Sequence, residues 1–310
     1  MLRLCIVARE LQSDVLLLTF SRADGGELPR FTAGAHIDLF LGNNLIRPYS
    51  LCSDPADRLH YQVAILKTTQ SQGGALAAHA LQVGDEVQVS EPRNLFALDP
   101  FAPFSLLIGG GIGITPMLAM AAELQTAQRP FSLHYCARTR QQAAFLDQLQ
   151  CASYARNVQI HFSDEQRLTL ISVLQGVPEN THVYVCGPPR LMAAVSEQAL
   201  ALGYRAEQIH QELFAAEVQT QGAAFDVTLA SNGLRVRVEE NQSIVEALAL
   251  AGVKVCVSCK QGICGSCLTD VLEGEPDHRD SYLTEEEKAS NQLILLCCSR
   301  AKSPHLLLDL

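Results

Sequence analysis

Positive charge is scarce in this sequence: its 310 residues include 23 Lys and Arg against 33 Asp and Glu, which gives a formal net charge of −10. Surfaces that bind nucleic acid carry a basic patch, so this balance argues against DNA or RNA as a partner. The N-terminus, MLRLCIVARE, lacks a signal-peptide core because Arg9 and Glu10 interrupt its apolar residues. The chain also shows no internal repeat.

One long uncharged run, residues 101–122, is interrupted by Pro103, Pro116 and four glycines between residues 109 and 113. A membrane-spanning helix needs about 20 consecutive apolar residues, and breaks of this kind are unusual in one. The run therefore predicts a buried strand, a tight turn and a helix. Without a targeting or spanning segment, we expect a cytoplasmic protein whose thiols stay reduced unless they bind metal.

The composition is that of a globular protein with two or three domains, since 48% of the residues are apolar and 18% are charged. The acidity is uneven. Residues 225–310 contain 13 acidic and 8 basic side chains, whereas residues 1–224 contain 20 and 15. The C-terminal segment is either an ordinary solvated surface or an acidic docking face for a protein partner.

Hydrophobic patterning divides the chain into three segments. Residues 1–99 alternate short apolar runs with turns, as an antiparallel β-barrel does, and one helix is expected over 75–81. Residues 100–220 alternate strands and helices, which predicts a doubly wound, parallel α/β domain. Residues 225–310 are expected to form a small α+β domain. Its signals are a hairpin turn at Ser231-Asn232-Gly233 and two capping boxes, Ser243 with Glu246 and Thr284 with Glu287.

The cysteines are concentrated near the C-terminus. Cys259, Cys264 and Cys267 have the spacing C-x4-C-x2-C, and Cys297 follows after twenty-nine residues. This is the plant-type [2Fe–2S] spacing, whereas structural zinc usually shows paired C-x2-C motifs. Cys298 adjoins Cys297, and only one of the two can face the cluster in an extended segment. Cys297 gives the commoner spacing and is preferred as the fourth ligand. Cys256, just before the motif, is expected to be a packed thiol.

Two loops indicate a nucleotide site. Residues 109–116, GGGIGITP, join a predicted strand to a predicted helix, where a pyrophosphate can meet backbone N–H groups. Pro116 stands where the dinucleotide fingerprint has its third glycine, and proline suits a first helical turn. The second loop begins at Cys186-Gly187 after another strand. Both loops are thus expected at the edge where open α/β sheets bind ligands.

The barrel segment contains a candidate flavin site. In Arg47-Pro-Tyr49-Ser50-Leu51, the arginine can hold a phosphate, the tyrosine can lie against a ring system and the serine can donate a hydrogen bond. Residues Ser71 to Gly74 offer further N–H groups to the same phosphate. In isolation these residues are as easily a packing tyrosine and a surface arginine. Together with the other two sites they favour a flavoprotein.

The motifs in this order resemble the phthalate dioxygenase reductase family, most closely its vanillate O-demethylase reductase and carnitine monooxygenase reductase branch. The resemblance covers essentially the whole chain and rests on RPYSL, GGGIGITPM, CGPPRLM, the cysteine motif, DHRDSYL and CCSRAKS. It implies electron transfer from NADH to FMN, then to the [2Fe–2S] cluster, and then to a Rieske-type oxygenase. Because the sequence has no Rieske motif, the oxygen chemistry is expected on another chain. The alternatives are a diiron or haem monooxygenase as acceptor, or a non-catalytic redox sensor.

The resemblance also assigns site residues. It implies that FMN is bound by Arg47, Tyr49, Ser50, Gly73 and Gly74. It implies that the nicotinamide nucleotide is bound by Gly111, Ile112, Gly113 and Thr115, with Cys186 and Gly187 near its ring. Phe214 resembles the aromatic residue that shields the flavin, and Asp164 would hold the adenine ribose and favour NADH; Arg138 and Arg140 leave NADPH open. One departure is Lys260, where such loops often carry an acid. Its charge is expected to favour the reduced cluster and raise the potential.

Overall fold

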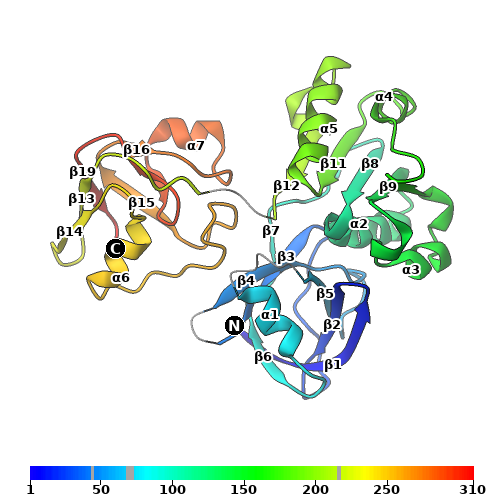
Figure 1. Ribbon diagram of the computed structural model, residues 1–310, viewed down its shortest axis with the longest axis horizontal. Helices are drawn as coiled ribbons and strands as arrows, with labels where there is room; N and C mark the ends of the chain where they lie inside the picture. Colours follow the sequence, from blue (N-terminus) through cyan, green and yellow to red (C-terminus); the bar gives the residue numbers. More distant parts are fainter. Residues whose placement is uncertain (43–44, 68–72, 215–217) are drawn as a thin grey trace. The chain divides into compact units, whose positions relative to one another are not determined.

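The computed structural model describes residues 1–42, 45–67, 73–214 and 218–310, and the chain divides into two units, residues 1–214 and 215–310 (Figure 1). The first unit contains an antiparallel sheet of order β4-β3-β6-β1-β2-β5, with β7 paired to β3. Its strands are β1 (Leu2–Gln12), β2 (Val15–Ser21), β3 (Ala35–Phe40), β4 (Ile46–Ser50), β5 (Tyr61–Leu66), β6 (Glu86–Val89) and β7 (Arg93–Asn94).

The strands of the antiparallel sheet turn alternate side chains toward one core. Leu4 and Ile6 on β1 are buried, and Leu16, Leu18 and Phe20 on β2 face the same core. Helix α1 (Gly74–Ala80) accompanies this sheet and packs Ala78 into it. The predicted antiparallel barrel and its single helix are confirmed.

The second sheet of this unit is parallel, with the order β10-β9-β8-β11-β12. Its strands are β8 (Ser105–Gly110), β9 (Phe131–Ala137), β10 (Val158–Phe162), β11 (His182–Cys186) and β12 (Ile209–Glu212). The helices are α2 (Ile114–Thr126), α3 (Leu146–Cys151), α4 (Leu170–Gln175) and α5 (Pro189–Ala201). Short 3-10 turns complete the domain at Gly111–Gly113, Arg140–Gln142, Ala155–Asn157 and Ala206–Gln208.

Strand β8 is buried on both faces, which explains its continuous apolar run. Leu107 packs with α2 in a core that also takes in Val15 and Ala64 of the antiparallel sheet. Leu106 and Ile108 point the other way, into a core with α4 and α5. The shared core explains why the two sheets form one unit. The predicted doubly wound domain is therefore confirmed, and no helix among the described residues is long and apolar enough to cross a bilayer.

The C-terminal unit is a small α+β fold with a mixed sheet of order β14-β13-β19-β15-β17 and a separate pair, β16 and β18. Its strands are β13 (Phe225–Leu229), β14 (Arg235–Val238), β15 (Leu268–Glu273), β16 (Pro276–Asp277), β17 (Leu293–Leu295), β18 (Arg300–Ala301) and β19 (His305–Leu308); its helices are α6 (Ile244–Leu250) and α7 (Glu285–Ser290). The predicted hairpin and both capping boxes are confirmed.

Two arginines fasten the start of this unit to its body. The buried Arg300 guanidinium donates to the carbonyls of Thr220, Gly222, Ala223, Glu239 and Gln242. It also lies over the ring of Phe225, 5.1 Å from the centroid. Arg279 donates to the carbonyls of Gln219 and Gln221 and pairs with Asp277. We call this arrangement of Arg279, Arg300 and residues 219–223 the arginine clasp.

Candidate functional site

The candidate flavin residues come together on the antiparallel sheet. Arg47, Tyr49 and Ser50 all lie on β4. Gly73 precedes α1 with a φ of 86°, and Gly74 is so close to the arginine that an added Cβ would lie 2.6 Å from Arg47 Cγ. A cationic side chain thus runs along backbone that has no side chain to obstruct it, which suits a phosphate group. Ser71, also expected here, lies outside the described residues.

The two nucleotide loops pack back to back at the carboxyl ends of adjacent strands. Cys186 on β11 is in register with Gly109 on β8. A Cβ on Gly113 would lie 2.3 Å from the carbonyl oxygen of Cys186, so only glycine permits this approach. The Thr115 hydroxyl donates to the carbonyl of Ile112 at 3.0 Å and is buried. Its side chain therefore shapes the glycine loop from within.

A carboxyl group that sequence reasoning missed lies between these sites. Glu212 ends β12 in register with Cys186, and the Ser50 hydroxyl donates to its Oε2 at 3.1 Å. Burial raises the pKa of Glu212 to about 8. Burial and the charge of Glu212 also raise the pKa of the Cys186 thiol well above its ordinary value. Glu212 stands at the end of the last strand of the parallel sheet, two residues before Phe214. This position is the one signal in the sequence that could have identified it as a site residue.

The remaining nucleotide candidates lie at the same edge of the parallel sheet. Asp164 follows β10, is exposed, and its backbone N–H donates to the carbonyl of Arg138 at 3.2 Å. The Arg140 guanidinium lies over the Phe162 ring, 4.7 Å from its centroid. Phe214 follows β12 and is 40% exposed, so its ring is available to cover a ligand.

The candidate cluster ligands converge in the C-terminal unit. Cys259, Cys264 and Cys267 lie in a loop of residues 253–267, called the cysteine loop below, and Cys297 follows β17. All four are buried, with exposed fractions between 3% and 6%. Hydrogen bonds among the four thiols lower the pKa of Cys259 and Cys267 and raise the pKa of Cys264 and Cys297. The four thiols are thus within hydrogen-bonding reach of one another.

Geometry separates the two adjacent cysteines. The Cys297 thiol contacts those of Cys259, Cys267 and the adjacent Cys298. Cys298 is also buried, and its Sγ lies 3.9 Å from the carbonyl of Leu295 and 3.8 Å from Ser299 Oγ. Among the described residues no group of three or more His, Cys, Asp or Glu is arranged to hold a metal ion. Contacts among four buried thiols fit a polynuclear centre.

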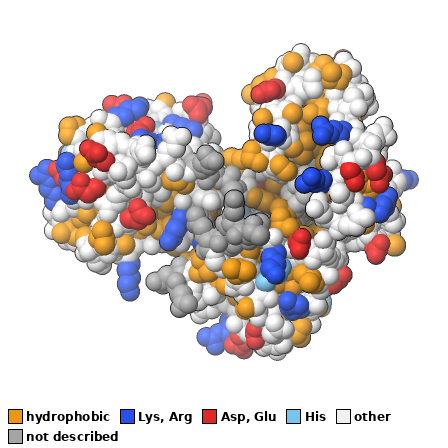
Figure 2. Space-filling model, viewed as in Figure 1, with side chains coloured by type: hydrophobic (Ala, Val, Ile, Leu, Met, Phe, Trp, Pro, Cys, Tyr) orange, Lys and Arg blue, Asp and Glu red, His pale blue; other side chains and the backbone are white. Residues whose placement is uncertain are grey.

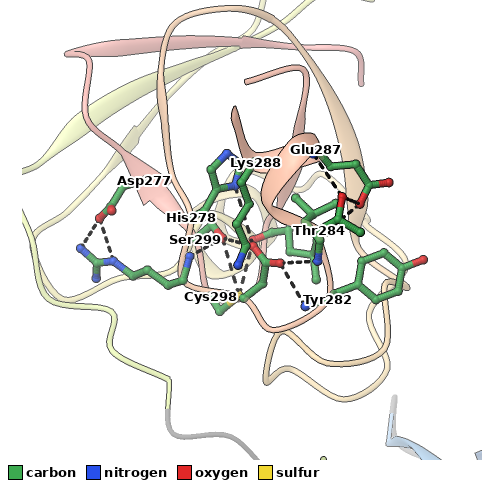
Figure 3. Close-up of polar contacts among 12 residues, drawn as sticks. Asp277, His278, Tyr282, Thr284, Glu287, Lys288, Cys298 and Ser299 are labelled. Atoms are coloured by element: carbon green, nitrogen blue, oxygen red, sulfur yellow. Dashed lines mark hydrogen bonds and ion pairs between the residues drawn. The ribbon is translucent and has the colours of Figure 1, made fainter. Parts of the chain in front are cut away.

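A short segment, residues 277–284, supports the cysteine loop, since the N–H of Ser281 donates to the carbonyl of Gly262. Figure 3 draws the polar contacts of this segment around Ser299. The Asp280 carboxylate accepts hydrogen bonds from the backbone N–H groups of Tyr282 and Leu283 and from the Ser299 hydroxyl. The turn holds the Tyr282 ring against Gly265, where φ is 71° and an added Cβ would lie 2.3 Å from the ring. Neither this support nor the full exposure of Cys256 was predicted.

Comparisons with known proteins agree with this geometry. Residues 107–197 match the oxidoreductase NAD-binding domain, and residues 227–302 match the 2Fe-2S iron-sulfur cluster binding domain. The fold and sites thus define an NAD-linked iron–sulfur oxidoreductase. Vanillate O-demethylase oxidoreductase of Pseudomonas sp. (strain HR199 / DSM 7063) is 46% identical over 308 residues, 97% of each chain. The carnitine monooxygenase reductase subunit of Escherichia coli (strain K12) is 42% identical over 306 residues, 97% of this chain and 95% of the relative.

Solved structures give the same result. Phthalate dioxygenase reductase matches with a TM-score of 0.77 and 37% identity, covering 100% of this chain and 98% of that one. An intact type IV self-sufficient cytochrome P450 monooxygenase matches with a TM-score of 0.87 and 38% identity; the match covers 99% of this chain but 41% of that longer one. The chain belongs to the phthalate dioxygenase reductase family.

Proposed function

We propose that the protein is the reductase component of a two-component oxygenase system, which oxidises NADH and passes electrons through FMN and a [2Fe–2S] cluster to a separate Rieske-type oxygenase. The observation that carries this proposal is the convergence of Ser50, Cys186 and Glu212, since it brings the flavin strand and the nicotinamide loop to one point. The family's C-terminal cluster domain supplies the onward route. We also propose that it acts in the cytoplasm, where free thiols stay reduced.

FMN accepts two electrons as a hydride and can release them singly, and the cluster carries one electron at a time. Arg47, with the open backbone at Gly73 and Gly74, would hold the flavin phosphate. Tyr49 would lie against the ring system, and Phe214 would shield the ring from water. Ser50 would orient the ring's reactive edge through its hydroxyl.

On the nucleotide side, the backbone of Gly111, Ile112 and Gly113, with Thr115 bracing the loop, would receive the pyrophosphate. Cys186 and Gly187 would face the nicotinamide. Because its pKa is raised, the Cys186 thiol stays neutral and presents an uncharged surface to that ring. Asp164 would accept hydrogen bonds from the adenine ribose hydroxyls and repel a 2′-phosphate, which favours NADH.

Glu212 would hold a proton near Ser50 at neutral pH, because its pKa is about 8. A neutral carboxyl avoids placing a negative charge where a hydride must pass. In the C-terminal unit, Cys259, Cys264, Cys267 and Cys297 would hold the cluster, with Cys298 packed behind Cys297. The chain's own contribution is thus positioning and the exclusion of water.

The test is an anaerobic titration of the purified holoprotein with NADH, after the released flavin has been identified. We expect FMN to bleach together with the appearance of a rhombic [2Fe–2S] EPR signal. Flavin reduction without that signal, in iron-replete protein, would refute the proposed route. A haem monooxygenase is the second candidate acceptor, because the reductase part of a self-sufficient cytochrome P450 is 38% identical to this chain. Electron delivery to purified oxygenases of each class would separate the two.

A further inference from the structure

Two lysines of the C-terminal unit differ from every other cation there. Lys254 and Lys260 lie in the cysteine loop, both are exposed, and neither forms an ion pair with a described residue. They are the only charged side chains between residues 253 and 267. The loop that covers the cluster ligands is therefore locally basic within a strongly acidic unit.

The other six Lys and Arg side chains of residues 218–310 are engaged. Arg235 and Arg237 pair with Asp226, and Arg279, Lys288 and Lys302 pair with Asp277, Glu285 and Glu275. Arg300 is buried in the arginine clasp. Figure 2 shows blue and red groups side by side on this unit, as such pairing requires. Among the Lys and Arg side chains of residues 218–310, only Lys254 and Lys260 have a charge that no described acidic group or carbonyl offsets.

The backbone of Lys260 is a second, independent observation. Its φ is 58°, in the left-handed region that favours glycine and strains a residue that carries a side chain. Lys260 directly follows the ligand Cys259, whose Sγ accepts a hydrogen bond from the N–H of Gln261 at 3.3 Å. A strained, exposed cation beside a redox centre is typical of a functional surface rather than a packing position.

Electron transfer requires close approach, because its rate falls steeply with distance. With the four ligands 3% to 6% exposed, the cysteine loop is a thin cover between the cluster and solvent. Beside the lysines, this cover presents the exposed Cys256 and the half-buried Val253, Val255 and Val257. A small apolar surface with charges at its rim is the usual composition of a transient docking site.

We propose that the oxygenase component docks over residues 253–263 of the cysteine loop with an acidic patch of its own. This inference rests on the proposed function. It differs from the acidic docking face that the composition suggests, because the docking surface of this chain is basic and that of the partner is acidic. The rest of residues 218–310 carries 13 acids and six engaged bases, so it repels an acidic partner. Attraction at one loop and repulsion elsewhere would orient the encounter.

The rival surface is the acidic start of α7, where Glu285, Glu286 and Glu287 lie in the first turn. Glu285 pairs with Lys288 and Glu287 caps the helix, which leaves Glu286 as its most available carboxylate. A basic partner would prefer this end. Reversing the charge of Lys254 in one variant and of Glu286 in another therefore tests which of the two surfaces the partner binds.

The experiment uses the holoprotein, reduced with dithionite and mixed in a stopped-flow instrument with one of two probes: an acidic b-type cytochrome or the basic cytochrome c. After excess dithionite has been removed, reoxidation of the cluster is followed at low and high ionic strength as the recovery of its visible absorption. We expect Lys254→Glu to slow reduction of the acidic cytochrome about 5- to 20-fold at low salt, with the difference vanishing at high salt. Lys254→Arg should stay within about twofold of wild type, and Glu286→Lys should leave this rate unchanged or faster.

The inference is overturned if Lys254→Glu leaves the acidic cytochrome's rate unchanged, or if Glu286→Lys alone controls both probes. Dithionite makes the measurement independent of NADH, so failure of the proposed function is recognised separately, by NADH failing to reduce the cluster. The cluster's EPR spectrum should be the same in all variants. If the EPR spectrum of Lys254→Glu is altered and that of Lys254→Gln is normal, the rates of Lys254→Gln are compared with wild type instead.

Discussion

Ser50 on β4 donates a hydrogen bond to Glu212 on β12 at 3.1 Å, and this bond joins the antiparallel and parallel sheets of the N-terminal unit. The carboxyl it holds is in register with Cys186, beside the expected path of the hydride. The protonation state of Glu212 therefore affects both β4, the strand expected to bind the flavin, and the loop at Cys186, which is expected to face the nicotinamide.

The pH dependence of flavin reduction should report Glu212. Because its pKa is about 8, we expect the rate of FMN reduction by NADH to fall several-fold between about pH 7 and 9, as a carboxylate forms where a hydride passes. Glu212→Gln keeps a hydrogen-bond acceptor for Ser50 and stays neutral, so its profile should be flat. Stopped-flow absorbance measures this step. Parallel profiles in both proteins would assign the titration to another group.

The same group should affect stability. Its pKa is raised from an ordinary value of 4.5, so the unfolded chain releases this proton at lower pH than the folded chain does. The folded state must therefore lose stability as pH rises from about 4.5 to about 8. Glu212→Gln should unfold at a higher temperature than wild type near pH 8 and at a similar temperature near pH 4.5. An equal difference at both pH values would contradict the assignment.

The contact between Gly265 and Tyr282 should couple the cysteine loop to its support. Gly265→Ala should destabilise the protein by about 2 kcal/mol or more, because φ is 71° and the new Cβ would meet the Tyr282 ring. In a Tyr282→Ala background the cost should fall to about 1 kcal/mol, since only backbone strain remains. Thermal unfolding of the four holoproteins measures this coupling. Additive effects would mean that the ring moves aside freely.

Substitution of the adjacent cysteines should separate ligand from neighbour. We expect Cys297→Ser to lose most of the cluster's visible absorption and EPR signal, because its thiol contacts those of Cys259 and Cys267. Cys298→Ser should retain a full cluster with a slightly altered spectrum, since the contacts of the Cys298 thiol are with Leu295, Ser299 and the adjacent Cys297. The reverse result would exchange their roles.

The charge of Lys260 should influence the cluster potential. Lys260→Glu replaces a cation next to Cys259 with an anion, which disfavours addition of an electron and should lower the midpoint potential. Lys302→Glu, a charge reversal of the same size at a lysine paired with Glu275, is the matched control and should have little effect. Redox titration followed by EPR compares them. An unchanged potential in Lys260→Glu would remove the electrostatic argument.

Sequence patterns predicted this fold well wherever the signal was local. The cysteine spacing, the glycine loop, the hairpin at Gly233 and both capping boxes each depend on residues a few positions apart, and each has a simple geometric cause. The three-segment order followed from the change in hydrophobic period, from two in the first sheet to buried strands and helices in the second.

What the sequence could not reveal depends on contacts across the fold. Glu212 is 162 positions from Ser50, and no short pattern marks its carboxyl as buried. Cys256 was expected to be a packed thiol and is exposed, because the cysteine loop turns it outward. Likewise, the structure alone shows that, among the described residues 218–310, Lys254 and Lys260 lack the ion pairs that Arg235, Arg237, Arg279, Lys288 and Lys302 form.

The arginine clasp determines at which residue the C-terminal unit must begin if it is to be joined to another protein in a fusion. The family match begins at residue 227, and hairpin β13–β14 invites a boundary near residue 225. Such a boundary removes three of the five carbonyls held by Arg300 and both held by Arg279. It would leave the buried Arg300 guanidinium with two of its five acceptors, so a fusion made for biocatalysis should begin no later than residue 218. The C-terminal unit that folds as a whole therefore begins earlier in the chain than the segment that the family match covers.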